Sequence, residues 1–110
     1  MKSLAKKCDK LFSEIIRKRG KCEACGSTEN LQCAHIHSRR YRNIRWNISN
    51  AICLCRGHHF YYTNHPLEWE QFIYEIRGRE VWEDLKKEAL LAPLKIDHKQ
   101  IILKLNEEAK

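Results

Sequence analysis

Two adjacent histidines, His58 and His59, lie in the segment CLCRGHHFYY, residues 53–62. On a helix, neighbouring side chains point about 100° apart, so one metal ion rarely binds both. A histidine can bind a metal through a neutral ring nitrogen, or it can accept a proton near neutral pH. The pair therefore raises the question of whether each imidazole belongs to a different site.

Cysteines at metal-binding spacing supply one such site. Cys22 and Cys25 form a C-x-x-C turn that Gly26 follows directly, and Cys55 and His58 repeat the spacing as C-x-x-H. Pairs at this spacing can place two ligand atoms on one tetrahedral ion. Four ligands of the type Cys3His leave no open position on zinc. The sequence therefore predicts a structural zinc site at these four residues.

Two other interpretations of the cysteines remain open. A C-x-x-C pair can be a redox centre, but such a pair is expected near a thioredoxin-like arrangement of strand and helix. A different zinc site would contain Cys53 or Cys33 in place of His58. We expect Cys8, Cys33 and Cys53 to lie in the core instead, because free cysteines are often buried.

A second group of residues could carry out chemistry beside this zinc site. His35 lies on a predicted strand, Asn50 just before a second strand, and His59 on the helix that follows. The zinc site would bring these segments together.

Residues 22–59, about a third of the chain, resemble the HNH endonucleases, in the subset that has a zinc knuckle. The matching stretch is CEACGSTENLQCAHIHSRRYRNIRWNISNAICLCRGHH. The order of the motifs and their spacing carry the resemblance.

The resemblance implies a ββα-metal fold and the hydrolysis of phosphodiester bonds in DNA, one strand at a time. His35 matches the general base that activates a water molecule, and Asn50 matches the asparagine that holds the loop and orients that base. His59 matches the helix ligand of a catalytic divalent ion, which we expect to be Mg2+ or Mn2+. Such an ion stabilises charge on phosphate oxygens, and an ordinary histidine can accept a proton near neutral pH.

The chain departs from the family pattern in two places. Many members have Asp or His as a second metal ligand immediately before the base, where this sequence has Ala34. His37, which we expect on the same strand face as His35, could take over that role. The other departure is His58 in place of the usual fourth cysteine, and zinc accepts either ligand.

The positive charge of the chain lies in its first half. Residues 1–55 contain 12 Lys/Arg and 4 Asp/Glu, whereas residues 56–110 contain 9 and 10, giving net charges of +8 and −1 that together make +7. This asymmetry favours a polyanionic partner, which we expect to be double-stranded DNA.

The loop between the base and the asparagine contains four arginines: Arg39, Arg40, Arg42 and Arg45. They form either a solvated turn or, as we expect, a clamp for phosphates. No segment resembles a base-reading helix, so we expect little sequence preference.

The elements that position these residues follow from periodicity. Apolar residues recur at helical spacing over residues 4–16, and Gly20 ends this basic amphipathic helix. Residues 31–37 form a predicted strand, and a second runs through residues 51–52. A helix then begins near Arg56 or Gly57.

Three more helices are predicted after residue 63. The first has Pro66 in its first turn, the second ends at Pro93, and the last has Asp97 as its N-cap. The sequence therefore predicts a mostly helical α+β protein with a ββα-metal core. We expect one domain over residues 1–110, with a basic helix in 1–20, the knuckle and core in 21–64, and C-terminal helices in 65–110.

Composition limits the remaining classes. The sequence has no run of about 18 apolar residues and no apolar signal-peptide segment at its start, so we expect a cytoplasmic protein with no membrane association. In that compartment six cysteines favour metal binding over disulfides. We expect a monomer or a weak dimer. The competing hypothesis is a zinc module that binds nucleic acid without cutting it, which would have no use for His35, Asn50 and His59.

Overall fold

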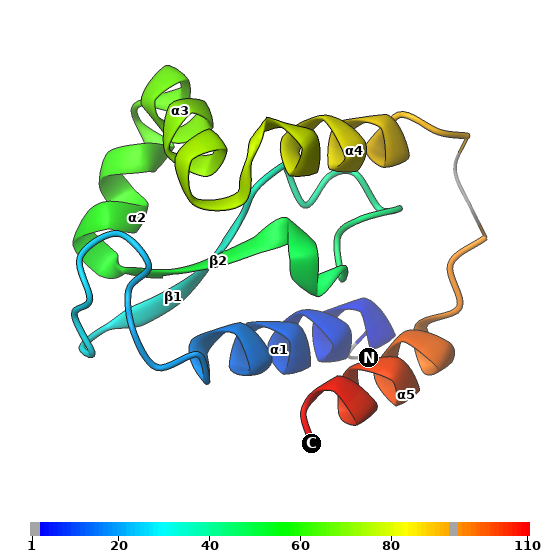
Figure 1. Cartoon of the computed structure of the whole chain (residues 1–110). Helices are drawn as coiled ribbons and strands as arrows, with labels where there is room; N and C mark the ends of the chain where they lie inside the picture. The colour runs from blue at the N-terminus through cyan, green and yellow to red at the C-terminus, as the bar shows by residue number, and fades with distance from the viewer. Residues whose placement is uncertain (1–2, 93–94) are drawn as a thin grey trace.

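The computed structural model describes residues 3–92 and 95–110. Over these ranges the chain is α+β, with five α-helices around one two-stranded antiparallel sheet. The elements are α1 (Leu4–Arg17), β1 (Leu31–His35), the 3-10 turn η1 (Ile48–Asn50), β2 (Ala51–Cys55), α2 (Arg56–Thr63), α3 (Pro66–Arg77), α4 (Arg79–Ala89) and α5 (His98–Glu108). Figure 1 shows α1 and α5 on one side of the sheet and α3 and α4 on the other.

The sheet pairs β1 with β2 so that Cys33 lies opposite Cys53 and His35 opposite Ala51. Side chains alternate along a strand, so each strand of this small sheet contributes to two cores. The strand β2 passes into α2 without a loop, and Cys55 is both the last residue of the strand and the N-cap of the helix. This junction fixes the direction of α2 relative to the sheet.

The core on the α1 side begins with a capped helix. Ser3 is the N-cap of α1, and its hydroxyl accepts a hydrogen bond from the Lys6 backbone N–H at 3.3 Å. The buried residues of α1 are Cys8, Phe12 and Ile16, which share one helical face. They pack with four buried residues from other segments: Trp46, Ala51, Cys53 and Leu105.

The core on the opposite face joins the sheet to the C-terminal helices. Ile52 and Leu54 of β2 are fully buried there, together with Ile73 of α3. Leu85 of α4 completes the contact from the next helix. Gly78, with φ of +92°, links α3 to α4 in a backbone conformation that side chains with a Cβ rarely adopt. The four helical segments expected from periodicity outside the knuckle are confirmed as α1, α3, α4 and α5.

Two predicted boundaries need adjustment. The strand predicted over residues 31–37 ends at His35, because the His37 backbone N–H donates to the Asn50 side chain and leaves the sheet ladder. The helix predicted to end at Pro93 ends at Ala89, and Pro93 lies outside the described residues. Asp97 caps α5 as expected, accepting hydrogen bonds from two backbone N–H groups. In the described ranges, no helix combines the length and apolar character that crossing a membrane requires.

Candidate metal centre and histidine cavity

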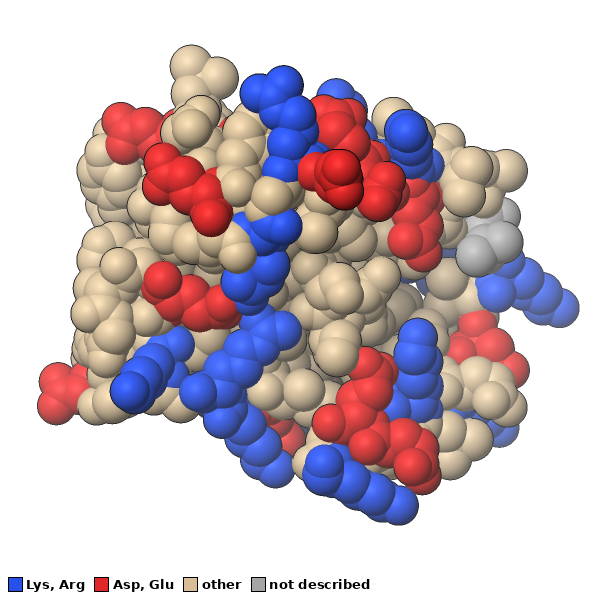
Figure 2. Space-filling model, in the orientation of Figure 1, with Lys and Arg blue, Asp and Glu red and all other residues tan. Residues whose placement is uncertain are grey.

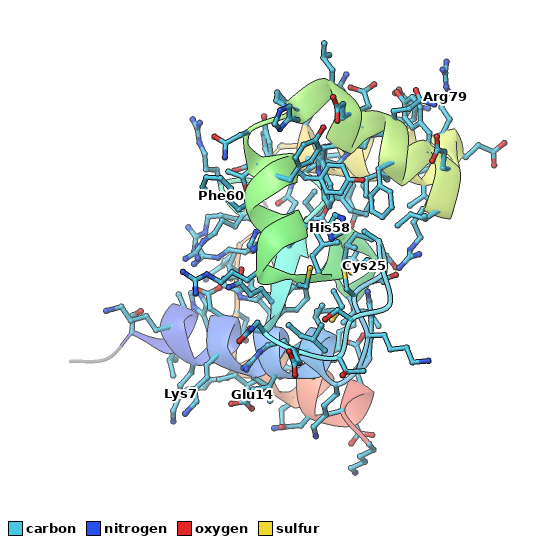
Figure 3. All side chains as sticks on the ribbon, turned by 90° about the vertical axis from the view of Figure 1, so that its left-hand side faces the viewer. Lys7, Glu14, Cys25, His58, Phe60 and Arg79 are labelled. Carbon is cyan, nitrogen blue, oxygen red and sulfur yellow. The ribbon has the colours of Figure 1, made fainter. Side chains whose placement is uncertain are left out.

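Cys22, Cys25, Cys55 and His58 lie together where the loop after α1 meets the junction of β2 and α2. Cys25 Sγ lies 3.9 Å from Cys55 Sγ, and His58 Nδ1 lies 3.3 Å from Cys55 Sγ and 4.0 Å from Cys22 Sγ. Tetrahedral zinc with ordinary bond lengths holds neighbouring S and N ligand atoms about 3.4–3.8 Å apart. The four side chains therefore fit a zinc ion. Figure 3 shows Cys25 and His58 on the same side of α2.

Short backbone hydrogen bonds build the first half of this group. The Cys22 N–H donates to the Ser27 carbonyl and the Gly26 N–H donates to the Cys22 carbonyl, both at 2.8 Å. Gly26 has φ of +78°, a conformation that glycine adopts at no steric cost. The turn thereby directs Cys22 and Cys25 to one side, as the C-x-x-C spacing predicts.

Glu23 attaches this turn to the sheet and to α3. Its carboxylate accepts a hydrogen bond from the Cys53 backbone N–H at 2.7 Å and forms ion pairs with Arg19 and Arg77. Burial works to raise the pKa of Glu23, but the Cys53 N–H and Arg77 bring it below its ordinary value. The ionised carboxylate therefore holds the cysteine turn against β2.

The electrostatics of the sulfur atoms suit a cation. Burial works to raise the pKa of Cys22, but backbone N–H groups, foremost that of Cys55, bring it below its ordinary value. For Cys25, the backbone N–H of Ser27 works to lower the pKa, yet burial and the neighbouring thiols of Cys22 and Cys55 raise it overall. A cation among the three sulfurs would remove this mutual repulsion and favour all three thiolates.

The other cysteines belong to the core, as expected. Cys8 and Cys53 are buried and Cys33 is half-buried against α1. Burial raises the pKa of Cys33 to about 12, so its thiol stays protonated at neutral pH. Within the described residues, Cys22, Cys25, Cys55 and His58 are the one group of three or more potential metal ligands. The alternative ligand sets with Cys33 or Cys53 are therefore not formed.

His35 lies at the end of β1 with its ring stacked on Phe12 of α1, the ring centroids being 5.3 Å apart. Its Nε2 lies 2.9 Å from the Arg45 carbonyl oxygen. Because a carbonyl only accepts hydrogen bonds, Nε2 carries the proton and Nδ1 keeps a free lone pair. Burial lowers the pKa of His35 below its ordinary value, so the imidazole is neutral at pH 7. His35 is therefore in the state that a general base requires.

His59 forms its hydrogen bond through the other ring nitrogen, Nδ1. Its Nδ1–H donates to Gln32 Oε1 at 2.7 Å, because an amide oxygen can only accept. Its Nε2 is then the nitrogen with a free lone pair. Burial lowers the pKa of His59, which keeps this imidazole neutral as well. A neutral imidazole whose second nitrogen donates to an oxygen is the usual form of a histidine that binds a metal.

The two histidines line one cavity of about 350 Å³ between the sheet edge, α2 and the start of α3. Ala34 also lines this cavity beside the two imidazoles, and its methyl side chain offers no ligand atom. The other lining residues with polar side-chain groups are Ser38, Tyr62, Thr63 and Trp69, and the Trp69 indole N–H donates to the Ile36 carbonyl. No Asp or Glu of the described ranges lines it. The cavity thus combines a potential base and one potential metal ligand.

Asn50 fixes the loop that leads from one strand to the other. Its side chain is fully buried, with Oδ1 accepting from the His37 N–H at 2.9 Å. Its Nδ2 donates to the carbonyls of His37 and Ile44 at 3.1 and 3.3 Å. The residue after Ile44 is Arg45, whose carbonyl holds His35. Asn50 therefore acts on His35 through the loop and does not face the cavity itself.

His37 does not join the other two histidines. Its Nε2 lies 2.9 Å from the Trp82 carbonyl oxygen and its ring packs edge-on against the Trp82 ring, with centroids 4.4 Å apart. The expectation that His37 shares a face with His35 is wrong, because β1 ends at His35 and the chain turns toward α4. The structure therefore does not bring His37 to His59 as a second ligand for a divalent ion.

The four loop arginines divide into two kinds. Arg45 is largely covered, with 18% of its side chain exposed, and its Nε and Nη2 donate to the two carboxylate oxygens of Asp9 on α1. Arg39 reaches the same carboxylate at 3.2 Å but remains 61% exposed. Arg40 and Arg42 are exposed. Arg45 is therefore not available to clamp phosphate, whereas the other three can reach solvent.

Asp9 stabilises this loop against α1. Besides the two arginines, it accepts a hydrogen bond from Trp46 Nε1 at 2.9 Å, which accounts for the burial of that indole. Burial works to raise the pKa of Asp9, but the hydrogen bonds from Arg45 and Trp46 lower it overall.

The charges on the surface are mixed. On the face drawn in Figure 2, a band of Lys and Arg runs from the level of α3 and α4 to α1, with Asp and Glu on both sides.

Several contributors to the site were not anticipated from sequence. Gln32 orients His59, Asp9 neutralises Arg45, and Glu23 anchors the knuckle. Of the three, only Glu23 is the sequence neighbour of a predicted site residue, Cys22, and nothing in the spacing of any of them identifies its partner.

In comparisons with known proteins, no family model matches the chain, and neither a curated protein nor a solved structure matches it.

Proposed function

We propose that this protein is a metal-dependent DNA endonuclease of the HNH type with a ββα-metal core, which nicks one strand of double-stranded DNA with little sequence preference. One observation carries the proposal. His35 and His59 line the same cavity, and the hydrogen bonds to the Arg45 carbonyl and Gln32 leave one basic nitrogen free on each ring. A base beside a metal ligand is what hydrolysis of a phosphodiester needs.

In this proposal Cys22, Cys25, Cys55 and His58 bind zinc for structure. Their spacing and distances suit a closed tetrahedral site. Zinc there would join the loop after α1 to the start of α2, the helix that carries His59. The metal would thus position the reactive residues without contacting the substrate.

His35 performs the proton transfer. Its Nδ1 accepts a proton from a water molecule, and the water oxygen forms a bond to phosphorus. The bond from phosphorus to the leaving oxygen breaks with its electron pair on that oxygen, which takes up a proton from solvent water. The positive imidazolium that results keeps its Nε2–H bond to the Arg45 carbonyl, which stabilises it. Asn50 supports this arrangement by holding the loop at His37 and at Ile44, the residue just before Arg45.

His59 would hold a divalent ion, Mg2+ or Mn2+, through Nε2, and such an ion supplies charge stabilisation at the phosphate oxygens. The exposed arginines Arg39, Arg40 and Arg42 are suited to contact the phosphates on either side. The net charge of +7 supports attraction to DNA, with affinity that falls as salt rises.

A second function has one observation in its favour. The cavity of His35 and His59 lacks a carboxylate ligand in the described residues, and carboxylates are the usual ligands of Mg2+. A zinc module that binds nucleic acid without cutting it would have this composition. The proposed nuclease would instead rely on His59, water and the phosphate itself.

The test is a nicking assay on supercoiled plasmid. Zinc-loaded protein, with zinc content measured in parallel, is given Mn2+ or Mg2+. Open circles should appear before linear product, and His35→Ala should reduce nicking by about 10²–10⁴ while DNA binding is kept. The matched control is His65→Ala, since His65 is an exposed histidine that does not line the cavity.

The outcomes separate the two functions. If the wild-type protein binds DNA but shows no ion-dependent nicking, the nuclease proposal is wrong and the function that stands is a zinc module that binds nucleic acid without cutting it. Nicking that His35→Ala and His65→Ala reduce equally would contradict the role of His35. Linear product before open circles would contradict a single cutting site for each monomer.

A further inference from the structure

A second, larger hollow lies on the other side of His59. It occupies about 840 Å³ between the beginning of β1 and the outer face of α2. We call it the α2 groove, and the residues that matter here are Asn30, Gln32, Arg56, His59, Phe60 and Asn64. Its size is within the about 300–1,000 Å³ range of sites for small organic groups. Because His59 lines both hollows, the α2 groove begins where the cavity of His35 ends.

Phe60 is a large apolar side chain that is mostly exposed to solvent. It is 73% exposed, although it follows His59 directly in the chain. No described aromatic ring stacks against it. Figure 3 shows Phe60 on the side of α2 opposite His58, so the ring takes no part in the knuckle. An exposed aromatic face beside a reactive centre is suited to stack on a planar group.

The charges of the α2 groove favour an anion. The guanidinium of Arg56 forms no hydrogen bond or ion pair with any described residue. No Asp or Glu is among the residues that line the groove. Besides His59 and the Thr63 hydroxyl, the polar side chains of the groove are the amides of Asn30, Gln32 and Asn64, which can donate to and accept from the edge of a base. Among the described residues, the groove thus offers one unpaired guanidinium and several amide groups but no carboxylate, which suits an anionic ligand with hydrogen-bonding edges.

We propose that the α2 groove binds one nucleotide of a DNA strand whose base has left the helical stack, with Phe60 against the base and Arg56 on a phosphate. In an intact duplex, both faces of a base are covered by its neighbours, so only an unpaired base can lie on Phe60. The substrate class that follows is duplex DNA that is locally unpaired next to the scissile phosphate, and a single-stranded oligonucleotide is the probe for its unpaired part. This inference rests on the proposed function for the identity of the scissile phosphate.

The test compares binding of one labelled oligonucleotide as a single strand and as a duplex. Full-length, zinc-loaded protein is used without Mg2+ or Mn2+, so that nothing is cut, and fluorescence anisotropy gives Kd. The wild-type protein should bind the single strand at least about tenfold more tightly than the duplex at the same salt. Loss of one stacked base lowers affinity by about 5- to 150-fold.

Phe60→Ala should therefore lose about tenfold or more for the single strand and little for the duplex, whereas Phe60→Tyr should retain binding. Leu67→Ala is the matched control, because Leu67 is 84% exposed on the next helix and lies outside the groove. Arg56→Gln should weaken binding and reduce the slope of log K against log salt by about 1.

Equal affinity for single strand and duplex would overturn the proposal, as would equal losses in Phe60→Ala and Leu67→Ala. Phe60 is exposed, so Phe60→Ala should unfold at the wild-type temperature. The nicking assay is read separately. If the protein prefers single strands through Phe60 but does not cut, the proposed nuclease function is wrong and the nucleotide site in the α2 groove stands. If it cuts but shows no such preference, only the proposed nucleotide site is wrong.

Discussion

His58 and His59 are adjacent in the chain but contact opposite strands of the sheet. His58 Nδ1 lies 3.3 Å from Cys55 Sγ at the end of β2, whereas His59 Nδ1 lies 2.7 Å from Gln32 Oε1 on β1. The turn of about 100° between successive helical residues accounts for this division. One imidazole can therefore take part in metal binding for structure while the other stays free for a different ligand.

Zinc retention should depend on Cys25 and not on His59. Cys25 is exposed, so Cys25→Ala removes a ligand without opening a cavity in the core. We expect the wild-type protein to purify with about one zinc for each chain, and Cys25→Ala to lose most of it and to unfold at lower temperature. Atomic absorption and thermal unfolding are the measurements.

Two variants serve as controls for this prediction. Cys33→Ala removes a cysteine that lies outside the cluster, and His59→Ala removes the neighbouring imidazole. Both should retain zinc. Full zinc content in Cys25→Ala would show that the four side chains do not form the site.

Asn50→Ala should destabilise the fold strongly. The substitution leaves the His37 N–H and two buried carbonyls without their partner. Unsatisfied buried groups of this kind should cost about 3 kcal/mol of unfolding free energy in total. Urea unfolding measures the change, with the exposed Asn106→Ala as control, for which we expect less than about 0.5 kcal/mol. A loss as small as that of the control would mean that the loop does not depend on Asn50.

The contact between Asp9 and Arg45 should make stability depend on pH. The folded pKa of Asp9 lies below its ordinary value of 3.8, so Asp9 contributes stability above that value. The contribution disappears as pH falls through the folded pKa. Wild-type protein should thus be more stable than Asp9→Asn at about pH 6, and the difference should shrink toward about pH 3. Urea midpoints at the two pH values test this, and a difference that does not change with pH would contradict it.

The metal cluster and the helices could be predicted from sequence because each depends on residues a few positions apart in the chain. The C-x-x-C and C-x-x-H spacings act within single turns, so the cluster of Cys22, Cys25, Cys55 and His58 followed from them. Periodicity gave the helices for the same reason. The cysteines Cys8 and Cys53 were expected in the core and are buried there.

The features that were missed depend on packing between distant elements. His37 turns toward Trp82 because the strand ends two residues early, and the hydrogen bonds of Asn50 that end it span 13 residues. Arg45 appeared available for phosphate because its partner Asp9 lies on α1, 36 residues away. In each case the partner is set by how α1 or α4 packs on the loop, which no spacing rule encodes.

Gln32 provides the most specific test of how His59 is prepared. Its Oε1 accepts the Nδ1–H of His59, which keeps the lone pair on Nε2. Gln32→Met has similar length but no acceptor, so the tautomer is no longer fixed. Partners of this kind typically change metal affinity by about 10–100-fold. We expect Gln32→Met to need at least about tenfold more Mn2+ for half-maximal nicking.

The matching variants separate this role from a general loss of structure. Gln32→Glu places a carboxylate on Nδ1 and should raise the pKa of His59, which burial now lowers, as an NMR titration of the ring protons would show. Gln71→Met, on an exposed part of α3, should change neither property. Zinc content should be the same in all three variants, because Gln32 does not touch the cluster. If Gln32→Met instead lost zinc and Mn2+ dependence together, Gln32 would be supporting the fold and not the tautomer of His59.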